Sequence, residues 1–172
     1  MERLEFSDEV FRQVMPQKEP MLLCDGVLAN DLSLNHQVGV YTVGARVAAP
    51  LTAKGELPAI CLMEVMAQTI AAILSGRRYE FDSDSVLKVG LFLSIRGFKM
   101  LKHFPQGFIP AGTKLYTAVD FFEGVEGVVL AEAIVSSAGE EIAKARLTVL
   151  NPTPQELEHA VGAEAAKILL SK

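Results

Sequence analysis

Two polar side chains, Glu64 and Gln68, lie four residues apart within the otherwise apolar stretch 58–76. On a helix, this spacing places both side chains on one face, one turn apart. Because an unpaired carboxylate is costly to bury, Glu64 must be hydrogen-bonded, protonated or facing a cavity. In the plainer interpretation, Gln68 satisfies Glu64 within a polar network of the core. In the functional interpretation, the carboxyl acts as a general acid or base near neutral pH and Gln68 supports it.

The stretch that carries these residues predicts a long buried helix over residues 58–76. Pro58 fits the first helical position, and Gly76 fits the point where a helix stops. Apolar residues run nearly all the way round the helix, which is typical of a helix buried on most sides. Around Pro58, Ala59 and Ile60, the first backbone N–H groups have no intrahelical partner and gather partial positive charge. We therefore expect this end to hold a carbonyl oxygen on which negative charge develops.

The rest of the chain predicts strands between short helices. A first helix over Asp8–Met15 is expected to stop at Pro16, and the pattern Thr153-Pro-Gln-Glu156 predicts a capped final helix. In the second predicted strand, Val38, Val40 and Thr42 alternate with Gly39, Tyr41 and Val43, so the two sets lie on opposite faces. The predicted strands cover residues 21–27, 34–45, 87–95, 114–122, 125–136 and 141–149, the last four as an antiparallel meander.

This order of elements favours the α+β class, with an antiparallel sheet wrapped around one long central helix, the hot-dog fold. A chain of 172 residues is long enough for one sizeable core and short for two full domains. We therefore predict a single domain over residues 1–172. Residues 1–20 form an N-terminal helix and lead-in, and residues 153–172 form an appended C-terminal helix.

Composition excludes several classes of protein. The net charge of −5 and the scattered lysines give no basic stripe, so nucleic acid is not an expected partner. The N-terminus is polar and acidic, unlike a secretory signal, and no uncharged apolar run reaches the roughly 20 residues of a membrane span. These features predict a cytoplasmic protein. Cys24 and Cys61 show neither a CxxC spacing nor a nearby His cluster, so we expect no metal site and no disulfide.

Two blocks of sequence resemble the 3-hydroxyacyl-acyl-carrier-protein dehydratases of the hot-dog superfamily. Residues 15–25, Met-Pro-Gln-Lys-Glu-Pro-Met-Leu-Leu-Cys-Asp, look like the family segment Leu-Pro-His-x-x-Pro-Phe/Met-Leu-Leu-x-Asp. Residues 57–68, Leu-Pro-Ala-Ile-Cys-Leu-Met-Glu-Val-Met-Ala-Gln, look like Phe-Pro-Gly-x-x-x-x-Glu-x-Met-Ala-Gln at identical spacing. A weaker block over residues 109–115 resembles the Val-x-Pro-Gly-Asp-x-Leu turn. The subgroup most similar to this chain is that of aryl-polyene biosynthesis.

The resemblance implies a lyase that acts on acyl thioesters in fatty-acid or polyene-type biosynthesis. Glu64 matches the catalytic carboxylate, Gln68 its polar support, and Ala59 the position whose N–H meets the thioester carbonyl. The substrate-binding positions implied are Pro58, Ala59, Ile60 and Met63, where Met63 fits either the helix core or an acyl tunnel. No cofactor is implied, since the acyl group arrives on the phosphopantetheine of acyl carrier protein or on CoA. The implied assembly is a homodimer or higher oligomer, or a hetero-oligomer with another hot-dog subunit.

The departure from the family pattern lies in the histidines. The family places a catalytic His fourteen residues before the Glu, where this chain has Pro50, and a second His where it has Gln17, which cannot titrate. Two histidines are possible replacement bases. His36 shares the alternation of Val38 in its strand and could therefore face the helix. His103 lies in a His-Phe-Pro-Gln-Gly segment that resembles the missing loop. For both, a surface or core role is the plainer interpretation.

Three functions therefore stay open. The first is a dehydratase variant that uses Glu64. The second is a non-catalytic subunit that binds acyl chains or supports an active dehydratase partner. The third is a hot-dog thioesterase, in which the helix carboxylate activates water against the same thioester. The cations at Arg96, Lys99, Lys102 and Lys114 fit either a basic rim for an acidic carrier protein or a scattered solvated surface.

Overall fold

The computed structural model describes residues 8–15, 17–28, 36–81, 91–122 and 128–150, together with 155, 158–159 and 162–165. The helical elements are α1 (Asp8–Val14), a 3₁₀ turn η1 (Ala59–Cys61) and α2 (Leu62–Phe81). The strands are β1 (Gly26–Val27), β2 (His36–Thr42), β3 (Leu57–Pro58), β4 (Leu91–Met100), β5 (Phe108–Ile109), β6 (Lys114–Phe122), β7 (Val128–Ser137) and β8 (Glu140–Leu150).

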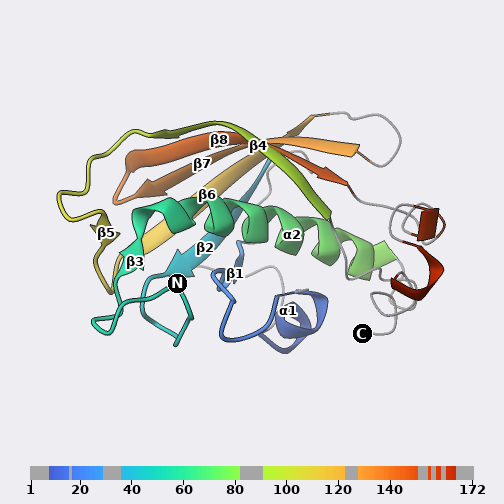
Figure 1. Cartoon of the computed structure of the whole chain (residues 1–172), viewed down its shortest axis with the longest axis horizontal. Coiled ribbons are helices and arrows are strands. Elements are labelled where there is room, and N and C mark those ends of the chain that lie inside the picture. The colour runs from blue at the N-terminus through green and yellow to red at the C-terminus, as the bar shows by residue number, and fades with distance from the viewer. Residues whose placement is uncertain are drawn as a thin grey trace.

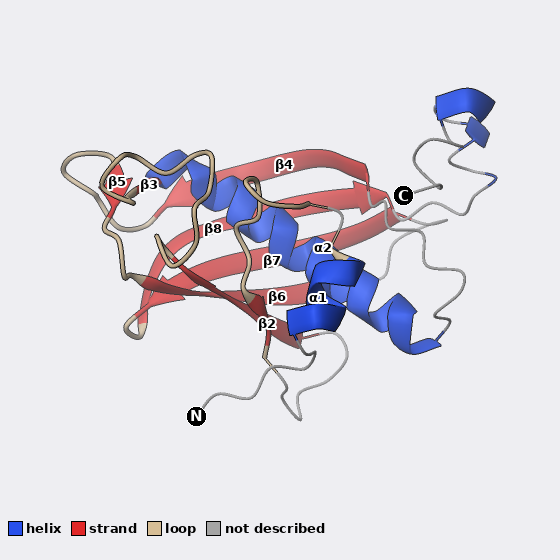
Figure 2. Cartoon of the chain, turned by 90° about the horizontal axis from the view of Figure 1, so that it is seen from below, coloured by secondary structure: helices blue, strands red, loops and turns tan. Residues whose placement is uncertain are grey.

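Six strands form one antiparallel sheet in the order β1-β2-β6-β7-β8-β4, and β3 pairs with β5 beside it. Figure 1 shows α2 lying along the inner face of this sheet, and Figure 2 shows α1 beside α2 on the side away from the strands. The hot-dog fold expected from the order of elements is therefore confirmed. We call the sheet surface turned away from α2 the outer face.

The core lies between α2 and the inner face of the sheet. Leu62, Met66 and Ile70 of α2 are completely buried, as are Leu115 and Val119 of β6. Burying each such side chain stabilises the fold by about 1.5–3 kcal/mol. The window Ala59–Gly76 is long and apolar enough to cross a membrane by length and composition, but 61% of it is buried inside the protein. Its hydrophobicity is thus explained by its place in the core.

The central helix differs at both ends from the predicted span 58–76. Pro58 does not take a helical position, because its ψ of 129° is extended and it pairs with Phe108 in the β3–β5 ladder. The helix continues through Gly76 to Phe81. A glycine costs a helix interior about 1 kcal/mol, which the packing of an otherwise buried helix outweighs. Gly76 is itself buried.

The strand predictions were right in type and uneven in extent. The bounds of β6 match the prediction, and β6, β7 and β8 form the expected meander. The third predicted strand, expected over residues 87–95, is β4, which lies instead at the far edge beside β8 and is shifted to Leu91–Met100. The strand predicted over residues 21–27 is reduced to Gly26–Val27, because a side chain of α2 takes hydrogen bonds of the preceding segment.

The terminal helices are described in part. Helix α1 covers Asp8–Val14, which confirms the predicted N-terminal helix. Within the predicted C-terminal helix, the described residues 155, 158–159 and 163–165 are helical, and Gly162 has a φ of +85°. The capping residues predicted at Thr153 and Glu156 lie outside the described residues.

Candidate functional site

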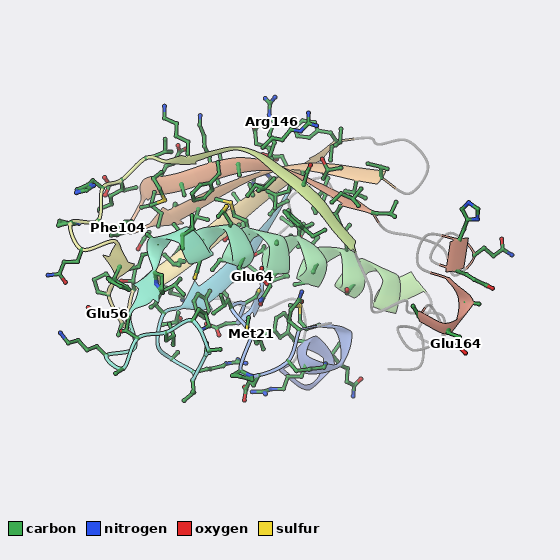
Figure 3. All side chains as sticks on the ribbon, in the orientation of Figure 1. Met21, Glu56, Glu64, Phe104, Arg146 and Glu164 are labelled. Carbon is green, nitrogen blue, oxygen red and sulfur yellow. The ribbon has the colours of Figure 1, made fainter. Side chains whose placement is uncertain are left out.

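Gln68 is the hub of the polar site. Its side chain is 0% exposed, and its amide nitrogen donates to the Met21 carbonyl (2.7 Å) and to Glu64 Oε1 (2.8 Å). Its amide oxygen accepts a hydrogen bond from the Leu23 N–H at 2.6 Å. Both donors and the acceptor of the amide are therefore used. Figure 3 shows Glu64 on the side of α2 that is turned toward Met21.

The segment Met21–Leu23, which accepts one hydrogen bond from Gln68 and donates one to it, is anchored at its other end. Asp25 Oδ2 accepts from the Thr42 N–H at 2.6 Å, and Arg46 Nε lies 3.4 Å from Asp25 Oδ1. Leu22, Leu23 and Cys24 between these points are buried in the core. A rigid segment thus fixes the amide of Gln68, and the amide fixes one oxygen of Glu64.

Glu64 combines a fixed oxygen with partial access to solvent. The residue is partly buried, and among the described residues only Gln68 is recorded as a hydrogen-bond partner of its carboxyl. Cys61 lies one turn earlier on the same face, and burial together with the negative charge of Glu64 raises the pKa of its thiol. The Glu64 carboxyl therefore acts electrostatically on its surroundings while Oε2 stays available to a ligand.

The start of the helix shows which backbone donor is free. The Ala59 N–H, expected to meet a carbonyl oxygen, instead donates to the Gly107 carbonyl at 2.8 Å. The Ile60 N–H precedes the first i→i+3 hydrogen bond of the 3₁₀ turn, and no partner is recorded for it among the described residues. The Ile60 side chain is 59% exposed. The donor at this end is thus one residue later than the sequence pattern suggested.

Among the described residues, neither candidate histidine forms a hydrogen bond with Glu64. The possibility that His36 faces the helix is excluded, because β2 turns Gly39 toward Thr69 of α2 and His36 has the opposite parity. His36 Nδ1 instead lies 2.5 Å from Asp120 Oδ1 across the β2–β6 pair. His103 is exposed on the loop that leads to Gly107. In the described part of the chain, no cluster of three His, Cys, Asp or Glu residues could hold a metal ion.

The positions of the two missing family histidines are also placed. Gln17 follows α1, and its buried Oε1 has no hydrogen-bond partner among the described residues. It lies at a depression of about 230 Å³ with Arg12, Lys18, Glu19 and Leu22, not in the hydrogen-bond network of Gln68. Pro50 lies half-buried in the loop between β2 and β3. Met63 is likewise partly buried, one position before Glu64.

Sequence reasoning missed the backbone partners of the site. These partners are backbone groups, so the residue types at these positions gave no sign of them in the sequence. They are the Met21 carbonyl, the Leu23 N–H and the Gly107 carbonyl. The two family-like blocks contain the residues of two of these contacts. One block contains Met21 and Leu23, and the other contains Glu64 and Gln68. The hydrogen bonds between α2 and residues 21–23 join these two blocks.

Comparisons with known proteins agree with this fold. A sequence model of a family described as ApeP dehydratase (ApeP-like) matches residues 10–161. A search of curated protein sequences finds no match. Among solved structures, the chain is similar to one from the dehydratase heterocomplex ApeI:P of Xenorhabdus doucetiae, with a TM-score of 0.73 and 22% identity over 89% of this chain and 97% of that chain.

Two further solved structures are similar in fold. A mutant of the phenylacetic acid degradation protein PaaI from Thermus thermophilus gives a TM-score of 0.50 and 17% identity over 73% of this chain and 91% of that chain. A putative thioesterase from Ralstonia eutropha gives a TM-score of 0.51 and 16% identity, covering 72% of this chain and 82% of that chain. At these identities, the likeness concerns the fold alone.

Proposed function

The chain belongs to the ApeP-like family of dehydratases, and from this premise we propose that it dehydrates 3-hydroxyacyl thioesters with Glu64 as its acid–base group. The observation that supports this most directly is the complete use of the Gln68 amide. Gln68 holds Glu64 Oε1 with one N–H while Met21 and Leu23 fix the amide from the other side. A carboxyl whose one oxygen is positioned and whose other oxygen is available can transfer protons in a defined direction.

In this reaction, Glu64 removes a proton from the carbon next to the thioester carbonyl. The electron pair of that C–H bond forms the carbon–carbon double bond, and the bond to the 3-hydroxyl breaks. Negative charge passes through the thioester oxygen, where the Ile60 N–H and the partial positive charge of the helix start stabilise it. The hydroxyl leaves as water once a proton reaches it, either from Glu64 itself or from a second group.

A second group is best supplied by another subunit. The two family histidine positions hold Pro50 and Gln17, and His36 is engaged with Asp120 on the other side of the sheet. Pairing between hot-dog subunits places the sites across the interface, so a hot-dog partner with its own histidine would complete the site beside Glu64. We accordingly propose a hetero-oligomer as the active form, with a cytoplasmic location and an acyl chain delivered on phosphopantetheine of a carrier protein or on CoA.

Exposed apolar side chains at the helix start support an acyl ligand. Pro58 pairs with Phe108, which is 37% exposed, and Ile60 follows at 59%. Met63 adds a flexible thioether beside the carboxyl. We propose that these residues line the path of the acyl chain toward Glu64, which is the role that the family pattern implied for Pro58, Ala59, Ile60 and Met63.

Two other functions remain defined alternatives. The absence of the family histidines favours a non-catalytic subunit that supports its partner. The carboxylate on the helix also suits a thioesterase, in which Glu64 would activate water and the thioester bond itself would break. Both alternatives keep the acyl thioester as ligand and differ from the proposal in the product.

The test incubates the purified protein, alone and with a candidate histidine-containing hot-dog subunit, with a 3-hydroxyacyl thioester of carrier protein. Mass spectrometry of the acyl group should show loss of one water, and this product should disappear with Glu64→Gln. Free acid in its place would indicate the thioesterase. If dehydration by the mixture persists unchanged with Glu64→Gln, the catalytic role of Glu64 is excluded and the chain is a supporting subunit.

A further inference from the structure

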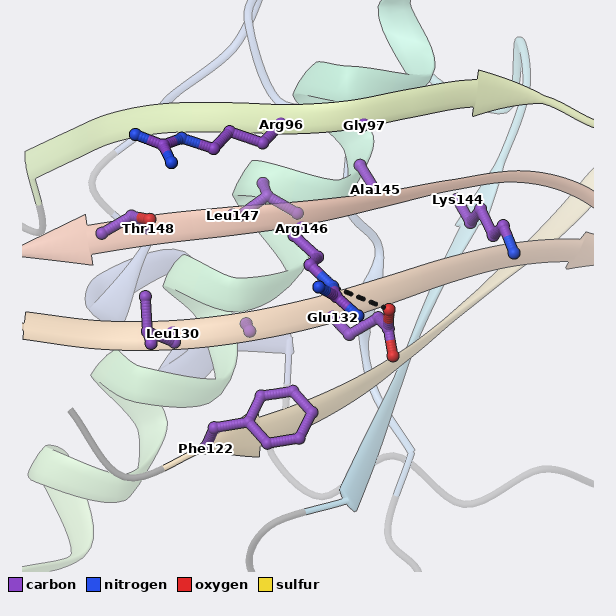
Figure 4. Close-up of a pocket in the computed structure, with 11 residues that line it drawn as sticks. Arg96, Gly97, Phe122, Leu130, Glu132, Lys144, Ala145, Arg146, Leu147 and Thr148 are labelled. Carbon is purple, nitrogen blue, oxygen red and sulfur yellow. Dashed lines mark hydrogen bonds and ion pairs between the residues drawn. The ribbon is translucent and has the colours of Figure 1, made fainter.

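The outer face of the sheet carries a depression of about 770 Å³ that combines apolar and cationic side chains (Figure 4). Phe122 and Leu130 form its apolar part, and they are 52% and 42% exposed. Cross-strand pairing puts these side chains on one face, because Phe122 lies opposite Leu130 and Leu130 lies opposite Thr148. A contiguous exposed apolar surface marks a place where another element packs.

Three cations border the depression, and we call them the outer-face cations: Arg96, Lys144 and Arg146. Arg146 lies opposite Arg96 of β4, and its Nε is 3.2 Å from Glu132 Oε1. No ion pair is recorded for Arg96 or Lys144 in the part of the chain that the structure describes. In Figure 3, Arg146 points away from α2. The depression therefore suits an occupant that is apolar along one side and acidic beside it.

The segment that follows β8 begins next to this depression. Thr148 lines the depression, and β8 ends two residues later at Leu150. Within the segment, Gly162 has a φ of +85°, and its N–H donates to the Glu158 carbonyl at 2.9 Å. This hydrogen bond and this φ are those of a helix that ends just before a glycine. With Pro154 at the expected first helical position, the predicted C-terminal helix therefore covers residues 154–161.

A helix over residues 154–161 is amphipathic. The helical period puts Leu157 and Val161 on one side, one turn apart. It puts Glu156 and Glu158 on the two flanks of that side, and we call these two the flanking carboxylates. The helix thus offers the combination that the depression requires, an apolar side with acidic groups beside it.

The length of this helix suits a position along β8. Eight residues of helix measure about 12 Å. Arg146 lies four residues before Leu150, which is about 13 Å back along the strand. Asn151-Pro152, between strand and helix, is a dipeptide typical of turns. A helix of eight residues is marginal by itself in water, so it needs a surface to pack on.

We propose that residues 154–161 pack as a helix into the outer-face depression of the same chain, running back along β8. Leu157 and Val161 then cover the apolar part of the depression. The flanking carboxylates then lie beside the outer-face cations, where opposite charges attract. Glu158 is exposed in the structure, so the docked helix is a second position of this segment. Because the outer face is turned away from α2, this docking is independent of the chemistry proposed for Glu64.

Hydrogen–deuterium exchange of the full chain tests the docking, with the amides of residues 157–161 as the readout. These amides should exchange slowly in the wild type, because the hydrogen bonds of a packed helix open rarely. The variant Lys144→Glu/Arg146→Glu should speed their exchange by about fivefold, and high salt should speed it in the wild type. Additional reversal of the flanking carboxylates, Glu156→Lys/Glu158→Lys, should restore slow exchange. The matched control Lys54→Glu reverses an exposed lysine outside the depression and should leave the rate unchanged.

A second variant keeps the proposal falsifiable if the charge-reversed chain folds poorly, as judged by circular dichroism. Leu130→Ser removes an apolar contact at a half-exposed position and should also speed exchange at residues 157–161. Exchange that neither Leu130→Ser nor high salt changes overturns the proposal, as does a charge swap that folds but does not restore slow exchange. Protection that is lost on dilution also overturns it, because the helix would then pack on a second copy. The turnover test of Glu64 is unaffected by any of these results.

Discussion

Gln68 donates one N–H to Glu64 Oε1 at 2.8 Å and the other to the Met21 carbonyl at 2.7 Å, so the carboxyl of Glu64 is positioned by a side chain that is itself fixed. Gln68 is completely buried, while Glu64 is partly exposed. We therefore expect Gln68 to contribute mainly to stability and Glu64 mainly to the chemistry. Substitutions at each should separate these contributions.

Removal of the carboxylate at Glu64 should affect catalysis far more than stability. Glu64→Gln retains an oxygen that can accept the hydrogen bond from Gln68, but it cannot take up a proton from the substrate. We expect turnover in the active assembly to fall by about 10²–10⁴-fold, with the free energy of unfolding changed by less than about 0.5 kcal/mol. Single-turnover assays and urea unfolding measure the two quantities. Glu56→Gln, also partly buried but outside the α2 network, should leave turnover unchanged.

Removal of the amide at Gln68 should affect stability first. Gln68→Ala leaves the buried Leu23 N–H and the part-buried Met21 carbonyl without their partner, so the free energy of unfolding should fall by about 2–4 kcal/mol. Urea unfolding monitored by circular dichroism measures this change. The control Gln13→Ala removes an exposed glutamine of α1 and should stay within about 0.5 kcal/mol of the wild type. Equal effects of both substitutions would contradict the role of Gln68 as a buried hub.

The periodicity of apolar residues predicted a helix or strand well where one physical cause determines its position. The all-round apolar sequence of α2 is typical of a helix buried in the core, and β6 follows a segment that contains the turn-forming Pro110 and Gly112. The ends of α2 could not be predicted from periodicity. Pro58 pairs with Phe108 in a strand, and packing keeps Gly76 within the helix. Both depend on residues remote in sequence. The same holds for residues 21–25, which lose strand pairing to a side chain of α2.

The candidate site was predicted in its side chains and not in its backbone. The spacing of Glu64 and Gln68 identified both members of the carboxyl–amide pair. The alternation of β2 was predicted, but not which face of the strand meets α2. The close approach of Gly39 to Thr69 identifies that face, since a Cβ at position 39 would lie 2.4 Å from Thr69 Cγ2. The donor at the helix start could not be chosen without knowing that Gly107 occupies the Ala59 N–H.

The contact between Gly39 and Thr69 gives a prediction about the seating of α2. A Cβ at position 39 would lie 2.4 Å from Thr69 Cγ2, so Gly39→Ala should lower the free energy of unfolding by about 1–3 kcal/mol. Thr69→Ala removes the clashing methyl group and should recover most of this loss in the double variant. Because Thr69 also donates to the Val65 carbonyl, a double-mutant cycle in urea is needed to isolate the coupling. Additive effects would mean that α2 does not rest on β2 at this point.

The thiol of Cys61 should report the charge on Glu64. Burial first, and the negative charge of Glu64 second, raise the pKa of Cys61, so the thiolate is scarce at mildly alkaline pH. Glu64→Gln removes the second cause and should lower that pKa, which increases the rate of alkylation by iodoacetamide. Cys24 is 1% exposed and serves as the internal control that should stay unmodified in both proteins. If the alkylation rate at Cys61 did not change with Glu64→Gln, the carboxylate would not act on the thiol.

Alkaline pH should unfold the protein through two buried groups. Burial raises the pKa of Cys24 from 9.0 to about 12 and that of Tyr41 from 10.0 to about 12. The unfolded chain therefore releases these protons at lower pH than the folded chain, so the free energy of unfolding is unaffected by them below pH 9 and falls as the pH rises toward 12. Urea unfolding at a series of pH values measures this slope. Cys24→Ser has no thiol to ionise and should reduce the decline that begins near pH 9, whereas Tyr41→Phe should reduce the part that begins near pH 10. If both variants kept the full wild-type slope, ionisation of Cys24 and Tyr41 would not explain the alkaline unfolding, and other groups would have to account for it.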